Sequence, residues 1–354
     1  MSPDELVPTE LTEKLRDRAD AADFESDWPA ESWNQLVAAG VTGWCIPTAH
    51  GGSERSSLEL LAGYEQLAGA CLTTTFILSQ RDAAVRRIRD SGRADLAREL
   101  LRPLACGGRF ATVGLSQLST SRQHGAPALT ARETSSGFVL DGVMPWVTGA
   151  DQAEHIVGGA VLPDGRQIMI VVMTDQPGVQ IEPPLSLAAL SGSRTSEVVC
   201  RNAEMPRHWL LAGPAPQVMS TGRGGTGGLE TSCLAIGHAG AAIADLQQEA
   251  ANRPNMEPVA ERLTATHESL RTQLHQLATG GGAADAALAL RARANALVIR
   301  ATQAALTASK GGGFVRPHPA QRRARQALFF LVWSCPRSAA EATLRHLADG
   351  PICS

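Results

Sequence analysis

The sequence predicts an α+β fold that is mostly helical, with helices at both ends and a compact antiparallel β domain between them. Two observations carry this prediction. Apolar residues recur at helical spacing before about residue 107 and after residue 212. Between these limits, short apolar runs alternate with turn residues, as in strands joined by hairpins. We therefore expect a helical domain at 1–107, a β domain at 108–212 and a helix bundle at 213–354.

The first region predicts a series of short helices. Thr9 is expected to cap a helix that carries Leu11 and Leu15. Four further helices are predicted, at Glu31–Ala39, Ser57–Ala70, Asp82–Asp90 and Ala94–Ala105. The segment VTGWCIPTAHGG, at 41–52, is broken by Gly and Pro and is expected to be a loop.

The middle region predicts strands connected by turns. Ala128–Glu133 and Gly137–Leu140 flank a Thr-Ser-Ser turn, as the arms of a hairpin do. The turn sequence PDGR separates two more apolar runs, His155–Leu162 and Gln167–Met173. Further strands are expected at Phe110–Leu115 and Ser196–Cys200.

The last region predicts four long helices, for which a four-helix bundle is the simple packing. One helix carries an apolar stripe formed by Val259, Leu263, Leu270, Leu274 and Leu277. The other three are expected at Leu229–Ala251, Ala283–Ala308 and Ala320–Trp333. The last of these should end in the stretch FFLVWSCPRS, since proline disfavours helix in the residue before it.

Composition narrows the class of protein. The 354 residues are 44% hydrophobic and 19% charged, with a net charge of -3, so we expect a soluble globular protein without affinity for nucleic acid. The seven cysteines form no C-x-x-C pair, which argues against a metal site or a disulfide framework. The polar N-terminus is no signal peptide, and no apolar run predicts membrane insertion. A cytoplasmic location is the expectation.

Two glycine-rich motifs have competing interpretations. GRGGTG, at 222–227, matches a dinucleotide-binding pattern but lacks the preceding strand, so a loop is favoured. KGGGF, at 310–314, is either a helix stop or a place where the backbone approaches a ligand.

Reactive side chains near the C-terminus also have structural interpretations. Cys335 follows a predicted helix C-terminus, where the dipole disfavours a thiolate nucleophile. His318 is favoured as a structural residue over a base. The run Arg322, Arg323 and Arg325 is most often a solvated face, although arginine also suits phosphate binding.

Taken together, the chain resembles the acyl-CoA dehydrogenase superfamily from about residue 9 to 349. The resemblance rests on the order and spacing of five segments: PTAHGGSERSSLELLAGYEQLA, FATVGLSQL, GFVLDGVMPWVTGADQAEHIV, SGSRTSEVVCRNAEMPRHWLL and KGGGFVRPHPAQRRARQALFFLVW. It implies a middle β-barrel and a C-terminal four-helix bundle, with FAD bound between them and completed by a neighbouring protomer. It also implies a homo-oligomer, a dimer or a tetramer.

The implied activity is FAD-dependent α,β-dehydrogenation of an acyl-CoA or related thioester, in which a Glu takes the α-proton. An electron-transfer flavoprotein or a paralogous subunit is then a candidate partner. Two alternatives stay open: a flavin monooxygenase of the same fold, and a non-catalytic partner subunit. The resemblance does not indicate which acyl chain is bound.

The resemblance also assigns cofactor-binding residues. They are Leu115 and Ser116 along the flavin, Trp146 and Thr148 beside it, Arg253 given by a neighbouring protomer, and Gly311 and Gly312 of the glycine loop. Several positions depart from the family pattern. Ser121, Arg122 and Gln123 replace the pyrophosphate turn, Met256 replaces a Phe, and Thr307 replaces a Gln.

The catalytic base is the most important departure. Counting forward from Arg325 and Gln326, which stand for the family's Arg-Asp, places Ser334 where the Glu is expected. Cys335 and Pro336 then replace the Gly and Thr that follow it. Some relatives carry the base on the first bundle helix, at a position that falls on Gly227 here. Glu230 lies one helical turn further on and is the candidate catalytic residue.

Overall fold

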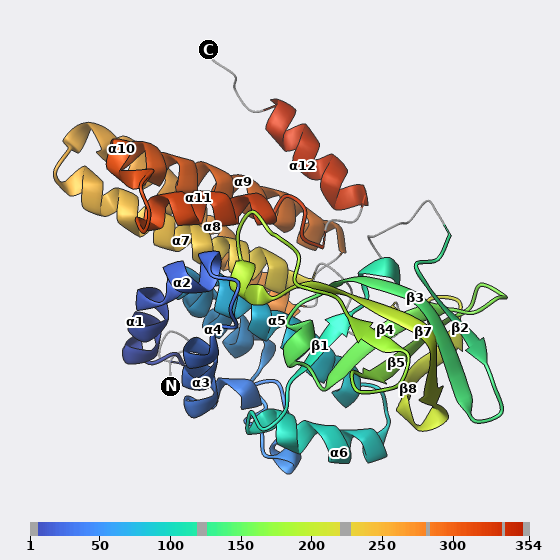
Figure 1. Ribbon diagram of the computed structural model, residues 1–354. Helices are drawn as coiled ribbons and strands as arrows, with labels where there is room; N and C mark the ends of the chain where they lie inside the picture. Colours follow the sequence, from blue (N-terminus) through green and yellow to red (C-terminus); the bar gives the residue numbers. More distant parts are fainter. Residues whose placement is uncertain (1–5, 119–125, 220–227, 281–283, 335–336, 350–354) are drawn as a thin grey trace.

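The computed structural model describes residues 6–118, 126–219, 228–280, 284–334 and 337–349 (Figure 1). Helices occupy both ends of the chain, and one sheet lies between them in sequence and to one side of them in space. This is the mostly helical α+β fold that the sequence predicts. Among the described residues, seven short 3₁₀ helices connect the larger elements: η2 (Val41–Gly43), η3 (Thr48–His50), η4 (Ser116–Leu118), η5 (Ala150–Gln152), η6 (Ser191–Ser193), η7 (Arg207–Trp209) and η8 (Pro254–Met256).

The described part of the N-terminal region, from residue 6 onward, contains six α-helices. They are α1 (Thr9–Asp17), α2 (Ala19–Phe24), α3 (Ala30–Ala38), α4 (Ser57–Ala70), α5 (Leu72–Arg89) and α6 (Ala94–Ala105). The predicted cap was wrong, because Pro8 is the N-cap of α1 and Thr9 is already helical. Helix α5 begins ten residues before the predicted start at Asp82. Its first turns hold three threonines of poor helix propensity, and their burial in the protein interior overrides that propensity.

The sheet has eight strands in the part of the chain that the structure describes. They are β1 (Ala111–Gly114), β2 (Leu129–Glu133), β3 (Gly137–Val147), β4 (His155–Val161), β5 (Gln167–Met173), β6 (Val179–Ile181), β7 (Ser196–Pro206) and β8 (Leu210–Ala215). Both predicted hairpins are present, since β2 pairs with β3 and β4 with β5 in antiparallel register. Strands β3 and β7 run past their predicted ends and pair along most of their length.

The prediction of an antiparallel barrel was wrong in two respects. The strand order is β6-β7-β3-β2-β4-β5-β8, and the described strands do not close into a barrel. The sheet is also mixed, because β1 and β2 both run parallel to β4. Strand β1 enters directly from the helical region and lies beside β4 without a hairpin, and sequence periodicity does not reveal such a long-range pairing.

The C-terminal helices form a bundle. They are α7 (Leu229–Ala251), α8 (Glu257–Gly280), α9 (Ala284–Ala308), α10 (Lys310–Gly313), α11 (Pro319–Phe329) and α12 (Arg337–Asp349). Helix α7 contacts α8, α9 and α11, which gives the predicted four-helix core. Of the predicted stripe on α8, Leu270 and Leu274 are buried, whereas Val259 is 38% exposed.

The fourth bundle helix is shorter than predicted. Helix α11 ends at Phe329, and residues 330–334 form turns. Helix α12 then projects away from the body of the protein, and it contacts α9 (Figure 1). The predicted helix to Trp333 was therefore too long by four residues, because apolar residues continue beyond the point where the chain turns.

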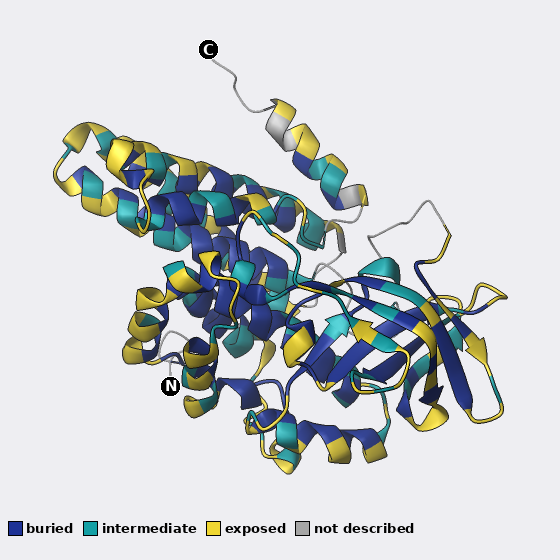
Figure 2. Ribbon diagram, in the orientation of Figure 1, coloured by how far each residue is buried: buried dark blue, intermediate teal, exposed yellow. Residues whose placement is uncertain are grey.

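Helices of the first and last regions cross closely. A Cβ atom added to Gly237 in α7 would overlap the main-chain oxygen of Glu65 in α4, so only glycine permits this approach. One hydrophobic cluster runs from Leu11 in α1 through Ile156 in β4 to Phe330 after α11 (Figure 2). The division of the chain at residues 107 and 212 stays a prediction.

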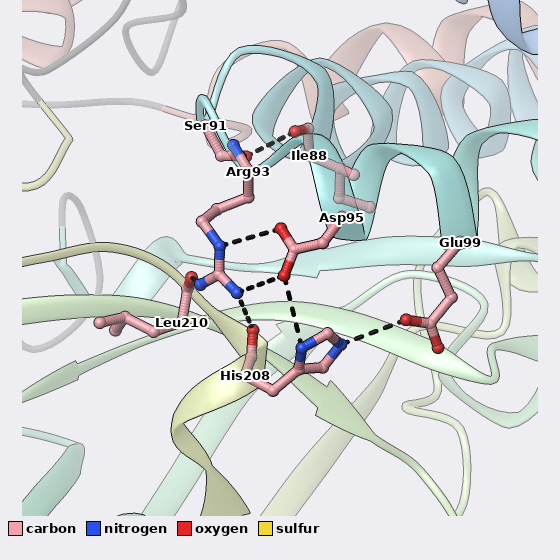
Figure 3. A network of polar contacts seen from close by, with 7 residues as sticks. All are labelled: Ile88, Ser91, Arg93, Asp95, Glu99, His208 and Leu210. Atoms are coloured by element: carbon pink, nitrogen blue, oxygen red, sulfur yellow. Dashed lines mark hydrogen bonds and ion pairs between the residues drawn. The ribbon is translucent and has the colours of Figure 1, made fainter.

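A network of polar contacts connects the N-terminal helical region to the sheet (Figure 3). Arg93, just before α6, donates hydrogen bonds to the main-chain oxygens of His208 and Leu210, at 2.9 and 2.7 Å. The His208 ring lies between two carboxylates of α6, 3.5 Å from Asp95 and 3.2 Å from Glu99. In the part of the chain that the structure describes, no helix combines the length and the apolar character needed to cross a membrane.

Candidate cofactor and substrate site

The segment after β1 is held against the neighbouring strand β4. The Gln117 side-chain amide donates to the main-chain oxygens of Gly114 and Gly159, at 2.8 Å each. A Cβ atom at Gly159 would overlap the Leu118 side chain. The absence of a side chain at Gly159 therefore allows the segment after β1 to pack directly against β4. The Leu115 side chain is buried, so a ligand that covers this segment would contact the main chain of Leu115 rather than its side chain. The predicted flavin contacts of Leu115 and Ser116 are compatible with this placement and stay predictions.

Strand β3 ends with an exposed aromatic ring and a buried hydroxyl. Trp146 is 51% exposed although it is a large apolar side chain, whereas Thr148 is buried. The Thr148 Oγ1 lies 3.3 Å from Thr195 Oγ1, which lies 2.9 Å from Ser193 Oγ. The neighbouring Ser196 Oγ is fully buried and has no hydrogen-bond partner among the described residues. An exposed indole beside buried hydroxyls fits a flat ring with polar edges, which is the chemistry of an isoalloxazine.

Arg253 already has partners within the protomer. It pairs with Glu249 and donates a 2.7 Å hydrogen bond to the Ala308 main-chain oxygen at the end of α9. This cation therefore caps a helix C-terminus, where the dipole favours positive charge. Its Nη1 is buried without a hydrogen-bond partner among the described residues, so the guanidinium retains one donor group for a phosphate.

The KGGGF motif forms an exposed turn of helix, α10. Lys310 has φ of +53°, and α9 stops two residues earlier at Ala308. Added Cβ atoms at Gly311 and Gly312 would contact nothing, so the main chain here is open to a ligand or a second protomer. Phe314, next to it, is 78% exposed.

The predicted cofactor residues form two groups that one protomer does not bring together. The group on β1 and β3 lies at the sheet, whereas Arg253 and the glycines of α10 lie at the far end of the bundle (Figure 1). A site that uses both groups needs a second protomer, as the family resemblance implies.

Ser334 lies at the end of a turn that α9 holds in place. Arg291 is buried and donates to the main-chain oxygens of Phe330 and Trp333, at 3.4 and 2.8 Å. Asn295, one helical turn later, donates to the Phe330 oxygen at 3.0 Å. Ser334 itself has φ of +44°, a left-handed conformation that ends the turn. Cys335 and Pro336 lie outside the described residues.

Three aromatic rings pack immediately before Ser334. The Phe76 ring, from α5, lies 4.8 Å from that of Phe329 and 5.0 Å from that of Trp333, both edge-on. Phe329 and Trp333 stack at 5.2 Å with an angle of 14° between their planes. Together they form an apolar wall beside the position where the resemblance places the base.

Glu230 forms an ion pair in the first turn of α7. Its carboxylate lies 3.4 Å from the Arg86 guanidinium of α5. Burial acts to lower the pKa of Arg86, but the charge of Glu230 together with Tyr64, Cys45 and Asp82 outweighs burial, and the pKa is raised. The carboxylate thus has a structural role, and its predicted role as base stays a prediction.

The remaining sequence motifs either make structural contacts or lie outside the described residues. His318 accepts a 3.1 Å hydrogen bond from the Ala320 N–H and caps α11. The solvated arginine face was a wrong prediction, because Arg322 and Arg323 are buried and pair with Asp20 and Asp245. GRGGTG and the segment Ser121–Gln123 lie outside the described residues. The described residues hold no cluster of three His, Cys, Asp or Glu side chains suited to a metal.

Sequence reasoning missed the residues that support the site. Arg291 and Asn295 are four residues apart in an alanine-rich helix, so they share one face, and this spacing was a usable signal. Ser193 and Thr195 gave no signal, because hydroxyl residues are common in loops.

Comparisons with known proteins agree with this architecture. The family model described as "Acyl-CoA dehydrogenase, N-terminal domain" matches residues 5–108. The probable acyl-CoA dehydrogenase YngJ of Bacillus subtilis is 25% identical over 248 residues, which are 68% of this chain and 65% of that protein. Isobutylamine N-hydroxylase of Streptomyces viridifaciens is 25% identical over 187 residues, 50% of this chain and 49% of that protein. The matched regions thus span less than two thirds of either relative.

The fold has close counterparts among solved structures. Butyryl-CoA dehydrogenase from Megasphaera elsdenii superposes with a TM-score of 0.84 at 18% identity, over 98% of both chains. Helices, a central sheet and a terminal bundle in this order define the class of acyl-CoA dehydrogenase-type folds. The chain belongs to the acyl-CoA dehydrogenase superfamily.

Proposed function

We propose that the protein is an FAD-dependent oxidoreductase that acts on an acyl thioester by α,β-dehydrogenation. The observation that supports this proposal most is the exposed Trp146 indole two residues from the buried Thr148 hydroxyl, because an aromatic face and a polar group near each other suit a flat ring with polar edges. The residues that would hold the cofactor are Leu115, Ser116, Trp146 and Thr148, with Arg253, Gly311 and Gly312 of a second protomer. FAD, when bound, supplies the acceptor for two electrons.

The chain's own residues would bind the thioester and take its α-proton. The main-chain N–H of Ser334 is a donor for the thioester oxygen. A serine hydroxyl is not a base at neutral pH without a partner. The proposed proton acceptor is therefore the Glu230 carboxylate, which must accept the proton while the cation of Arg86 lies 3.4 Å away. This arrangement predicts a slow proton transfer.

A flavin monooxygenase is the second candidate. Two observations favour it: Ser334 occupies the position of the usual base, and the chain is similar to a protein named as an N-hydroxylase. Such a reaction needs no proton removal by a Glu at position 334. The third alternative is a non-catalytic partner subunit.

The cofactor contacts predict weak FAD binding. Thr307, Met256 and Pro336 replace three residues that assist binding in the family, and each lost contact costs about 1 kcal/mol. The shared site also predicts a homo-oligomer, for which exposed apolar residues such as Leu328, Val332 and Leu344 provide contact area. Light scattering at micromolar protein should give a dimer or tetramer mass, and a monomer mass would contradict the shared site.

The test begins with the visible absorbance spectrum of the protein titrated with FAD. Binding supports a flavoprotein, and no binding at high micromolar FAD leaves the partner-subunit alternative. The loaded protein is then mixed without oxygen with acyl-CoAs of several lengths. Loss of the flavin absorbance together with an enoyl thioester product supports the dehydrogenase. No loss with any thioester, but oxygen-dependent hydroxylation of an amine, supports the monooxygenase.

A further inference from the structure

Three buried hydroxyls form a chain beneath the candidate cofactor site. Thr148 follows β3, Ser193 ends η6, and Thr195 precedes β7. All three side chains are buried, with exposed fractions of 4%, 0% and 5% in that order. The main chain holds the two segments together, because the Gly149 N–H donates to the Ser193 oxygen at 2.8 Å. The hydroxyls are therefore fixed in place and shielded from water.

The middle hydroxyl connects the other two. Thr195 Oγ1 lies 3.3 Å from Thr148 Oγ1 and 2.9 Å from Ser193 Oγ. In the part of the chain that the structure describes, these are the side-chain hydrogen bonds that the three hydroxyls make. The charged neighbour Arg194 does not take part, because its guanidinium binds Asp151 instead.

Each hydroxyl has a single hydrogen to donate, so Thr195 can donate to only one of its two neighbours. In the first direction, Ser193 donates to Thr195 and Thr195 donates to Thr148. The Thr148 hydrogen is then available for a ligand. In the two other arrangements, Thr148 donates to Thr195 and presents only lone pairs to a ligand. An acceptor atom placed at Thr148 selects the first direction, and each bond in such a chain strengthens the next.

We propose that Thr195 and Ser193 are positioning residues, which aim the Thr148 hydroxyl hydrogen at an acceptor atom on the edge of the flavin. The inference rests on the proposed function, since it requires FAD over Trp146 and Thr148. It assigns a role to two residues that do not themselves contact the cofactor. Without Thr195, the Thr148 oxygen loses its donor, and no water reaches the buried site to replace it.

The experiment measures FAD affinity and the flavin midpoint potential for Thr195→Val, Thr195→Ser, Ser193→Ala and Thr148→Val. Valine keeps the shape of threonine without the hydroxyl, and serine keeps the hydroxyl. We expect Thr195→Val to weaken FAD binding about fivefold, the equivalent of one hydrogen bond. We also expect it to shift the midpoint potential to more negative values. Ser193→Ala should have a smaller effect of the same sign, and Thr195→Ser should resemble the wild type.

A double-mutant cycle separates positioning from a structural role. Once Thr148→Val has removed the donor, Thr195→Val should cause no further loss of FAD affinity. Equal losses in both backgrounds would overturn the proposal, as would wild-type affinity and potential in Thr195→Val. If the wild-type protein binds no FAD, both this inference and the proposed function are wrong. If it binds FAD and Thr195→Val is unchanged, only the positioning role is wrong.

Discussion

The side-chain amide of Gln326 donates a 2.9 Å hydrogen bond to the fully buried carboxylate of Asp23. Gln326 stands where the family resemblance expects an Asp, and here a carboxylate from α2 occupies the same interior region. Asp23 also accepts from the Leu190 N–H at 2.8 Å and pairs with Arg325 at 2.7 Å. The Asp23 carboxylate thus connects α2, the loop before β7 and α11.

Replacing Asp23 should destabilise the protein strongly. Asp23→Ala leaves three donors facing a cavity, and removal of one partner of a buried pair costs about 3 kcal/mol. Arg325 is partly exposed, so water offsets some of this loss. The matched control is Asp23→Asn, which keeps one acceptor oxygen and should lose about 1 kcal/mol. Urea unfolding measures both, and equal losses would show that the carboxylate charge has no role.

The buried His238 should make stability fall in acid. Burial, with the charge of Arg323, lowers the pKa of His238 to about 3 from the ordinary 6.5. Between these two pH values the unfolded chain binds the proton and the folded protein does not. Stability should therefore decrease as pH falls from 6.5 toward 3, by up to about 1.4 kcal/mol per pH unit from this group.

The control for this pH dependence is His238→Gln, which keeps a side-chain donor for the Arg323 main-chain oxygen. The free energy of unfolding of the variant should change less steeply between pH 7 and pH 5. Some slope should remain, because burial also lowers the pKa of His155 and His267. If the slope of the variant equals that of the wild type, the pKa of His238 is the same in the folded and the unfolded protein.

Ser334→Glu should increase the rate at which an acyl-CoA reduces the flavin under anaerobic conditions. A positioned base contributes roughly 10²- to 10⁴-fold to proton transfer, and the turn held by Arg291 is already formed. The wild type should react slowly or not at all. No gain in Ser334→Glu, with FAD bound, would contradict the placement of the base position at Ser334.

Glu230→Gln tests the remaining carboxylate. If Glu230 is the base, this variant should abolish any slow reduction seen in the wild type. It also removes the ion pair with Arg86, whose partly exposed setting limits the loss of stability to about 1 kcal/mol. Arg86→Lys is the matched control, since it keeps a cation at the pair. Fast reduction that survives Glu230→Gln would assign the proton transfer elsewhere.

The aromatic wall should limit the length of the acyl chain. Phe76→Ala removes the ring that packs edge-on against Phe329 and Trp333, and it should cost about 3 kcal/mol of stability. The vacated space lies against Trp333, which directly precedes Ser334 in the chain, so we expect the variant to bind longer acyl-CoAs more tightly than the wild type does. Phe76→Leu, which fills most of the space, should not. Unchanged chain-length preference would place the acyl group away from this wall.

The sequence identified the candidate site in pieces. A short motif singled out Trp146 and Thr148, because they are two residues apart in the chain and need no distant partner. Their contact with a cofactor stays a prediction. Ser193 and Thr195 were not predictable, and the spacing of Arg291 and Asn295 did not reveal their partners, since each acts on residues that the chain brings close only in the folded state. The prediction that Arg322 lies on a solvated face was wrong for the same reason. Arg322 is buried against Asp20, which lies some three hundred residues away in the sequence.

Local periodicity determined most of the secondary structure. The helix Leu229–Ala251 and the hairpins of the sheet follow from side-chain spacing and from turn residues. Both are local properties, because they depend only on residues a few positions apart in the sequence. Tertiary structure alone decided that β1 runs parallel to β4, that the sheet stays open, and that α11 ends at Phe329. These outcomes depend on which surfaces are buried together, and burial is a property of the whole fold.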